Sequence, residues 1–183
     1  IVDSLVGSEM CIRDRCVYWG YVLPNSSTHT LLSVITNDMK LKFKQAFMQC
    51  AETFAQLSSA TRLKVGCIIV KHNRIISIGY NGMPSGWDNC CEDTIHHHEL
   101  GTSTVLSKPE VLHAETNAIA KVAQSSESCK DATLFCTHTP CLDCAKLIYQ
   151  SGITTVYYKH QYRSARGSGI EFLEKSDVTV EQI

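Results

Sequence analysis

A strand–helix–strand pattern between residues 132 and 158 constrains the fold more than any other feature of the chain. Ala132–Thr137 and Ile153–Tyr158 are short runs of apolar and β-branched residues, which are typical of buried strands. Between them, Pro140 suits the first turn of a helix and Gly152 suits its end. Two strands joined by one crossover helix lie parallel in one sheet. The pattern therefore predicts an α/β protein.

The flanking residues extend this alternation. We expect a hairpin from two apolar runs that are separated by three polar residues, and a long loop over residues 81–111, where glycine and proline recur. Long loops of this kind are usually functional or carry insertions. The further predicted elements are helices over Leu41–Leu57, His113–Gln124 and Ile170–Lys175, and strands over Val65–Val70, Arg74–Tyr80 and Val178–Val180.

The first 38 residues do not continue this pattern. Charged residues such as Asp3 and Glu9 interrupt any apolar segment near the start, so the segment is not typical of a signal peptide. Residues 1–15 resemble the translation of a sequencing-library adapter, and Met39 is a candidate start of the natural protein. We therefore expect an atypical leader, artefactual or disordered, over residues 1–38 and one folded domain over residues 39–183.

Composition excludes several classes of protein. The formal net charge is −1, so no global electrostatic attraction to nucleic acid polymers or anionic membranes is expected. No apolar run approaches the roughly 18 residues that a transmembrane helix needs. The chain has 10 cysteines, and Cys67 and Cys136 lie within apolar runs that suit buried free thiols. We interpret this as a reducing, cytoplasmic environment.

Two short motifs carry the chemistry. His113-Ala114-Glu115 begins one predicted helix, and Pro140-Cys141-Leu142-Asp143-Cys144 begins another. Cysteines three apart at a helix start can direct both sulfurs to one centre, and the helix dipole favours their thiolates. With His113 as third ligand, a tetrahedral zinc keeps one position open for water, as catalytic zinc sites do. Glu115 is then placed to transfer protons.

Other interpretations of the two cysteines are a structural zinc site and a thiol redox pair. A four-cysteine site has little support, because the other closely spaced cysteines, Cys90 and Cys91, are adjacent to each other. A redox pair would leave the His-Ala-Glu motif unexplained. The combination of motifs is a known signature of zinc deaminases.

Four strings connect the chain to a known family. They are Lys64-Val65-Gly66-Cys67, Gly79-Tyr80-Asn81-Gly82-Met83-Pro84-Ser85-Gly86, His113-Ala114-Glu115-Thr116-Asn117-Ala118-Ile119 and Pro140-Cys141-Leu142-Asp143-Cys144-Ala145-Lys146. Through these strings, the chain from about residue 39 onward resembles the deoxycytidylate (dCMP) deaminase family of the cytidine deaminase-like superfamily. Thr116 departs from the family pattern, since relatives often have leucine there.

The resemblance implies a three-layer α/β/α fold with a mixed sheet of about five strands, and hydrolysis of dCMP to dUMP for thymidylate synthesis. It also implies a homo-oligomer, often a hexamer, activated by dCTP with Mg²⁺ and inhibited by dTTP. The implied substrate-binding residues are Asn81, Ala114, Thr139 and Tyr162, and the implied allosteric-nucleotide residues are Tyr80, Gly82, Arg62 and Lys64. Tyr162 is equally well interpreted as a surface tyrosine, and Arg62 and Lys64 as solvated charges.

Several alternatives stay open. His96, His97 and His98, with Cys90 and Cys91 nearby, resemble the second, structural zinc site of some viral relatives, although a solvated polar loop is the favoured interpretation. The chain could instead deaminate dCTP or free cytosine nucleosides. An editor of tRNA or single-stranded DNA is a further alternative, but it would need a basic groove, which a net charge of −1 disfavours. A zinc-binding module without activity is the last alternative, but such a module would not need Glu115.

Overall fold

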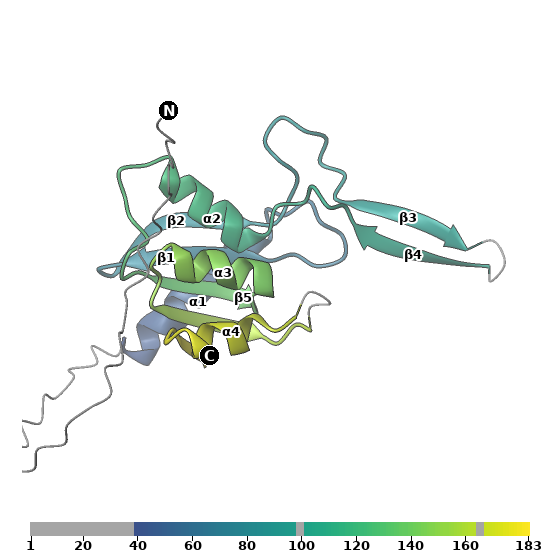
Figure 1. The fold of residues 1–183 in the computed structure, drawn as a ribbon. Coiled ribbons are helices and arrows are strands. Elements are labelled where there is room, and N and C mark those ends of the chain that lie inside the picture. Colours follow the sequence, from purple (N-terminus) through teal and green to yellow (C-terminus); the bar gives the residue numbers. More distant parts are fainter. Residues whose placement is uncertain (1–38, 98–100, 164–166) are drawn as a thin grey trace, which may run out of the picture. The chain divides into compact units, whose positions relative to one another are not determined.

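The computed structural model describes residues 39–97, 101–163 and 167–183 of the chain (Figure 1). The predicted leader therefore lies outside the described residues. The helices are α1 (Leu41–Ala55), α2 (Ala114–Ala123), α3 (Leu142–Gln150) and α4 (Gly169–Lys175). The strands are β1 (Gly66–Lys71), β2 (Arg74–Tyr80), β3 (Glu92–His97), β4 (Thr102–Ser107), β5 (Thr133–His138), β6 (Thr155–His160) and β7 (Thr179–Gln182).

A mixed five-stranded sheet in the order β2-β1-β5-β6-β7 forms the centre of the fold. The hairpin β1–β2 is antiparallel, and so is the pairing of β1 with β5. The pairs β5–β6 and β6–β7 are parallel, which confirms the predicted crossover through α3. The three-layer α/β/α prediction is also confirmed, because helices cover both faces of the sheet (Figure 1).

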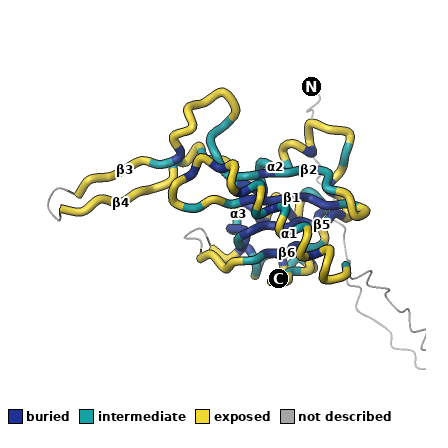
Figure 2. Tube along the Cα trace, turned by 180° about the vertical axis from the view of Figure 1, so that it is seen from behind, coloured by how far each residue is buried: buried dark blue, intermediate teal, exposed yellow. Residues whose placement is uncertain are grey.

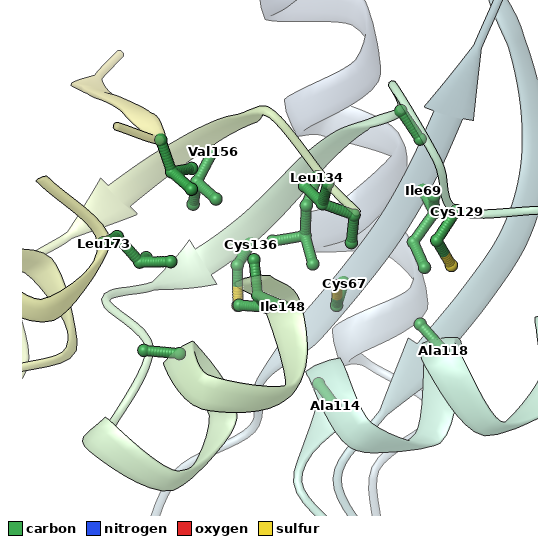
Figure 3. Packing of buried hydrophobic residues seen from close by; sticks show 14 of the residues in the cluster. Cys67, Ile69, Ala114, Ala118, Cys129, Leu134, Cys136, Ile148, Val156 and Leu173 are labelled. Atoms are coloured by element: carbon green, nitrogen blue, oxygen red, sulfur yellow. The ribbon is translucent and has the colours of Figure 1, made fainter. Parts of the chain in front are cut away.

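Alternation along the strands divides the core into two layers. On β1, Cys67 and Ile69 point to the face covered by α2, α3 and α4, whereas Ile68 and Val70 point to the face covered by α1. Cys67 lies opposite Cys136 of β5 in the antiparallel register, and both are buried free thiols, as predicted. Figure 3 shows this pair beneath Ala114 of α2 and Ile148 of α3. Helices α2 and α3 therefore lie beside each other over the middle of the sheet.

Most element boundaries differ from the sequence predictions by one or two residues, and one predicted loop contains two strands. The predicted loop over residues 81–111 contains the hairpin β3–β4, whose strands are exposed along almost their whole length and extend away from the sheet (Figures 1 and 2). Strand β6 begins two residues later than expected. Ile153, its predicted first residue, is buried but lies just before the strand. Helix α3 begins after Cys141, its N-cap residue, so Pro140 lies just before the helix.

Candidate active site

Helix α2 is fixed firmly onto strand β2. The Ser77 hydroxyl donates a hydrogen bond to the Ala118 carbonyl at 2.7 Å, and the Asn117 amide donates to the Tyr80 carbonyl at 2.9 Å. Just before the helix, Leu112 forms a β-bridge with Gly82. These contacts hold both ends of the first helical turn, so the side chains of that turn have a defined position over the sheet.

His113 is the N-cap residue of α2, and its extended backbone turns the chain into the helix. Its carbonyl accepts bonds from the Thr116 hydroxyl at 2.9 Å and from the Asn117 backbone N–H at 3.0 Å. Thr116, where relatives often have leucine, therefore supports the first turn of the helix with its hydroxyl group. Glu115, in the same turn, is only 4% exposed.

Cys141 and Cys144 come from the start of α3. Cys141 is held at the end of β5 by a β-bridge to Ser168, and Cys144 lies one turn further along, almost fully buried. Their sulfurs lie 3.5 Å and 3.3 Å from the Nδ1 atom of His113, respectively. The two helix starts thus bring together the three predicted ligands.

The geometry of these three residues fits a zinc ion. All three donor atoms lie within 4.8 Å of one another. Around a tetrahedral zinc, bond lengths of about 2.0–2.1 Å to nitrogen and 2.3 Å to sulfur place nitrogen and sulfur roughly 3.5 Å apart. One imidazole and two thiols also form a typical zinc donor set. Three protein ligands leave a fourth position, the pattern of catalytic rather than structural zinc.

Hydrogen bonding between the two thiols shifts their pKa values in opposite directions. A hydrogen bond from Cys144 lowers the pKa of Cys141 to about 4, and His113 contributes in the same direction. The same hydrogen bond, together with burial, raises the pKa of Cys144 far above its ordinary value. These shifts favour the thiolate form, which binds metal, at Cys141.

Glu115 faces this cluster from α2. Burial raises the pKa of its carboxyl group, although its own backbone N–H and the charge of His113 act in the opposite direction. Interaction with Cys144 also lowers this pKa, to a smaller extent. A carboxyl group with a raised pKa beside a metal site is suited to accept and return a proton. The arrangement is that of a hydrolytic metal centre with an adjacent acid–base group.

Comparison with known proteins agrees with this geometry. The profile of the cytidine and deoxycytidylate deaminase zinc-binding region matches residues 41–160. The chain belongs to this family. It is 35% identical over 144 residues to the deoxycytidylate deaminase of Saccharomyces cerevisiae, covering 79% of this chain and 46% of the yeast protein. It thus spans about half the length of that relative.

Two phage proteins match over most of their length. The deoxycytidylate deaminase of Enterobacteria phage T4 is 32% identical over 166 residues, covering 73% of this chain and 86% of that protein. A crystal structure of dCMP deaminase from cyanophage S-TIM5 in complex with dCMP and dUMP is 46% identical, with a TM-score of 0.69. This match covers 79% of the present chain and 99% of the phage chain. The similarity therefore extends beyond the zinc-binding region to nearly the whole fold of the S-TIM5 enzyme.

Asn81, a predicted substrate-binding residue, contacts the loop before β1. Its Oδ1 atom accepts a hydrogen bond from the Val65 backbone at 2.8 Å, and its Nδ2 atom donates to the Leu63 carbonyl at 2.8 Å. The side chain therefore joins the end of β2 to the start of β1. Its contact with substrate stays a prediction.

Of the other predicted substrate-binding residues, Ala114 and Thr139 lie close to the metal ligands in the sequence, and Tyr162 contacts Thr139. Ala114 is buried between His113 and Glu115. Thr139, two residues before Cys141, uses its hydroxyl group to accept a hydrogen bond from the Tyr162 N–H and to donate one to the Tyr162 carbonyl, both at 2.9 Å. The Tyr162 side chain is 45% exposed. Thr139 thus holds the backbone of Tyr162 beside the loop that carries Cys141.

The predicted allosteric residues occupy two neighbouring segments. Tyr80 is the last residue of β2 and Gly82 follows two residues later, and the centre of the Tyr80 ring lies 5.3 Å from the Lys121 ammonium group. Lys64 is exposed just before β1, and the Arg62 guanidinium donates to the Ser107 hydroxyl at 3.2 Å, at the base of the β3–β4 hairpin. Their role in nucleotide binding stays a prediction.

The group considered for a second zinc lies on or beside the β3–β4 hairpin. In the parts of the chain that the structure describes, the His113–Cys141–Cys144 group alone brings three metal-type donor atoms together. The Cys90 thiol donates to the Glu92 carbonyl at 3.4 Å, and His97 contacts Thr104 at 3.0 Å. His98 lies outside the described residues.

Among the described helices, none is both long and apolar enough to cross a membrane.

Sequence reasoning missed residues that support the site. Ser77 and Gly169 were not singled out, and Asn117 and Gly79 were named only within the strings that carry the resemblance. The structure shows that Ser77 and Asn117 bind α2 to β2, and that the two glycines lie against the ligand-bearing segments. A glycine within a strand can indicate close backbone approach. Which backbone approaches it is defined only by the folded structure.

Proposed function

We propose that this chain catalyses the hydrolytic deamination of dCMP, giving dUMP and ammonia. The observation that carries the proposal is the convergence of His113, Cys141 and Cys144 with the buried carboxyl group of Glu115. The S-TIM5 relative, whose crystal structure contains dCMP and dUMP, supports this choice of substrate. The proposed net reaction replaces the C4 amino group of cytosine with oxygen from water.

The three ligand residues would hold a zinc ion at the two helix starts. When bound, zinc supplies a Lewis acid that lowers the pKa of water and so provides a nucleophile near neutral pH. Glu115 would take a proton from the attacking water and deliver it to ring N3 of cytosine. It would then transfer the remaining proton of the new C4 hydroxyl group to the amino group, which departs as ammonia. Because burial raises its pKa, this carboxyl group can exchange a proton more readily than an exposed glutamate near neutral pH.

The segments around the metal site would bind the rest of the substrate. Asn81 fixes the loop before β1, and Thr139 fixes the backbone of Tyr162. A half-exposed tyrosine ring beside the ligand loop is suited to pack against a pyrimidine ring. We assign Asn81, Ala114, Thr139 and Tyr162 to substrate binding on this basis.

Regulation and assembly extend the proposal. The chain would be a cytoplasmic homo-oligomer, a hexamer by resemblance, that is activated by dCTP with Mg²⁺ and inhibited by dTTP. Lys64 and Arg62 offer positive charge near Tyr80 and Gly82, since the Asn81 side chain joins these two segments. Supply of dUMP for thymidylate synthesis would be its metabolic role.

The direct test measures dUMP and ammonia released from dCMP by the zinc-loaded protein, with deoxycytidine and dCTP assayed in parallel. Replacing Glu115→Gln should retain zinc and reduce turnover by roughly 10²- to 10⁴-fold, the range for general acid–base catalysis. Glu110→Gln makes the same chemical change at an exposed residue and should have no effect. Full activity of the Glu115 variant would refute the acid–base role of Glu115. Faster turnover of dCTP or deoxycytidine than of dCMP would refute dCMP as the preferred substrate.

A further inference from the structure

Two glycines lie directly behind the metal-binding segments. Gly79 is in β2, beneath the first turn of α2, and a Cβ atom built on it would lie 2.0 Å from the Ala114 carbonyl oxygen. Gly169 is the first residue of α4, and a Cβ atom there would lie 2.2 Å from the Pro140 carbonyl oxygen and 2.8 Å from that of Cys141. Each glycine therefore contacts the backbone beside a metal ligand.

We propose that Gly79 and Gly169 are positioning residues that set the separation between the two helix starts, and so place His113 and Cys141 at zinc-binding distance. Gly79 lets α2 lie against β2 from one side, and Gly169 lets the Pro140–Cys141 segment lie against α4 from the other. This inference rests on the proposed zinc site and explains how the fold builds it.

Neither contact can relax easily around an added methyl group. At Gly79, the two nearest opposing atoms belong to the helix backbone. The hydrogen bonds of Ser77 and Asn117 also fix α2 to β2. At Gly169, α4 is anchored by the fully buried Leu173, and the preceding Ser168 forms the β-bridge to Cys141. A side chain at either glycine would therefore displace the ligand-bearing backbone.

The expected displacement is large on the scale of metal coordination. Alanine at either site would force a shift of roughly 1 Å, because cores are close-packed and backbone cannot rotate away as a side chain can. Misplacements of about 1 Å can lower reaction rates by around 10²-fold. Loss of support around metal ligands commonly weakens metal affinity by about 10- to 100-fold.

Gly66 supplies a matched control for this test. A Cβ atom on Gly66 would lie 2.0 Å from the Ala51 carbonyl oxygen, so the clash is as severe as at Gly79. The clash is with α1, however, on the face of the sheet away from α2 and α3.

The experiment compares Gly79→Ala, Gly169→Ala and Gly66→Ala in the full chain. Zinc affinity is measured by competition with a chelator, Co²⁺ replaces zinc to report coordination geometry by its visible absorption, and thermal unfolding of the metal-free proteins reports stability. We expect zinc binding about 10- to 100-fold weaker for the Gly79 and Gly169 variants, with an altered Co²⁺ spectrum. The Gly66 variant should lose stability but keep the wild-type spectrum and affinity.

Two results would overturn the inference. One is wild-type zinc affinity and a wild-type Co²⁺ spectrum in both the Gly79 and the Gly169 variants. The other is an equal loss of affinity in the Gly66 variant, which would attribute the effect to general destabilisation. If one variant fails to fold, the other carries the comparison alone. Failure of the wild-type chain to bind zinc would instead refute the proposed function itself.

Discussion

Replacing Thr139→Val tests how the ligand loop is connected to Tyr162. Valine has nearly the same shape as threonine but lacks the hydroxyl group that bonds the Tyr162 N–H and carbonyl at 2.9 Å each. At about 0.5–1.5 kcal/mol net for each hydrogen bond, the two together contribute roughly 1–3 kcal/mol. Because Tyr162 is half-exposed, water can replace part of the lost bonding, and we expect the lower half of that range.

The assay combines urea denaturation of the metal-free protein with steady-state kinetics on dCMP. We expect the Thr139→Val variant to have a lower free energy of unfolding, a raised KM and unchanged zinc content. Thr139→Ser keeps the hydroxyl group and is the matched control. The reasoning fails if the valine and serine variants have the same stability and the same KM.

Two further predictions concern other parts of the structure. Ser77→Ala removes the buried hydroxyl bond to the Ala118 carbonyl, so the free energy of unfolding should fall by about 1 kcal/mol in denaturant titrations, and an unchanged midpoint would contradict this. Replacing residues 93–106 with a short glycine–serine linker should leave zinc affinity unchanged, because the described residues of that segment are exposed; loss of zinc binding would show that the hairpin supports the site.

The central sheet and its helices could be predicted because their side chains follow simple periodicities. Apolar residues recur at helical spacing in α1, and continuous apolar runs indicate β1 and β5. The β3–β4 hairpin was missed because its strands have no buried face and hence no apolar alternation. Its β-branched residues, such as Thr104 and Val105, were the available signal.

The convergence of His113, Cys141 and Cys144 could be predicted because their chemistry and spacing are local in the sequence. His113 is separated from Cys141 by a strand and a helix, yet both lie at helix starts over one face of the sheet. The supporting contacts could not be predicted in this way. Gly169 and Thr139 act through backbone groups that approach them only in the folded chain, and neither residue type indicates such a partner.

X-ray absorption spectroscopy of the zinc-loaded protein tests the central claim most directly. The account predicts two sulfur ligands near 2.3 Å, one imidazole nitrogen near 2.0–2.1 Å and one further light atom that is not supplied by the chain. Substituting Cys144→Ser should remove one sulfur from that shell. A shell of four sulfurs, or zinc that stays in place when both His113 and Cys144 are substituted, would contradict the account.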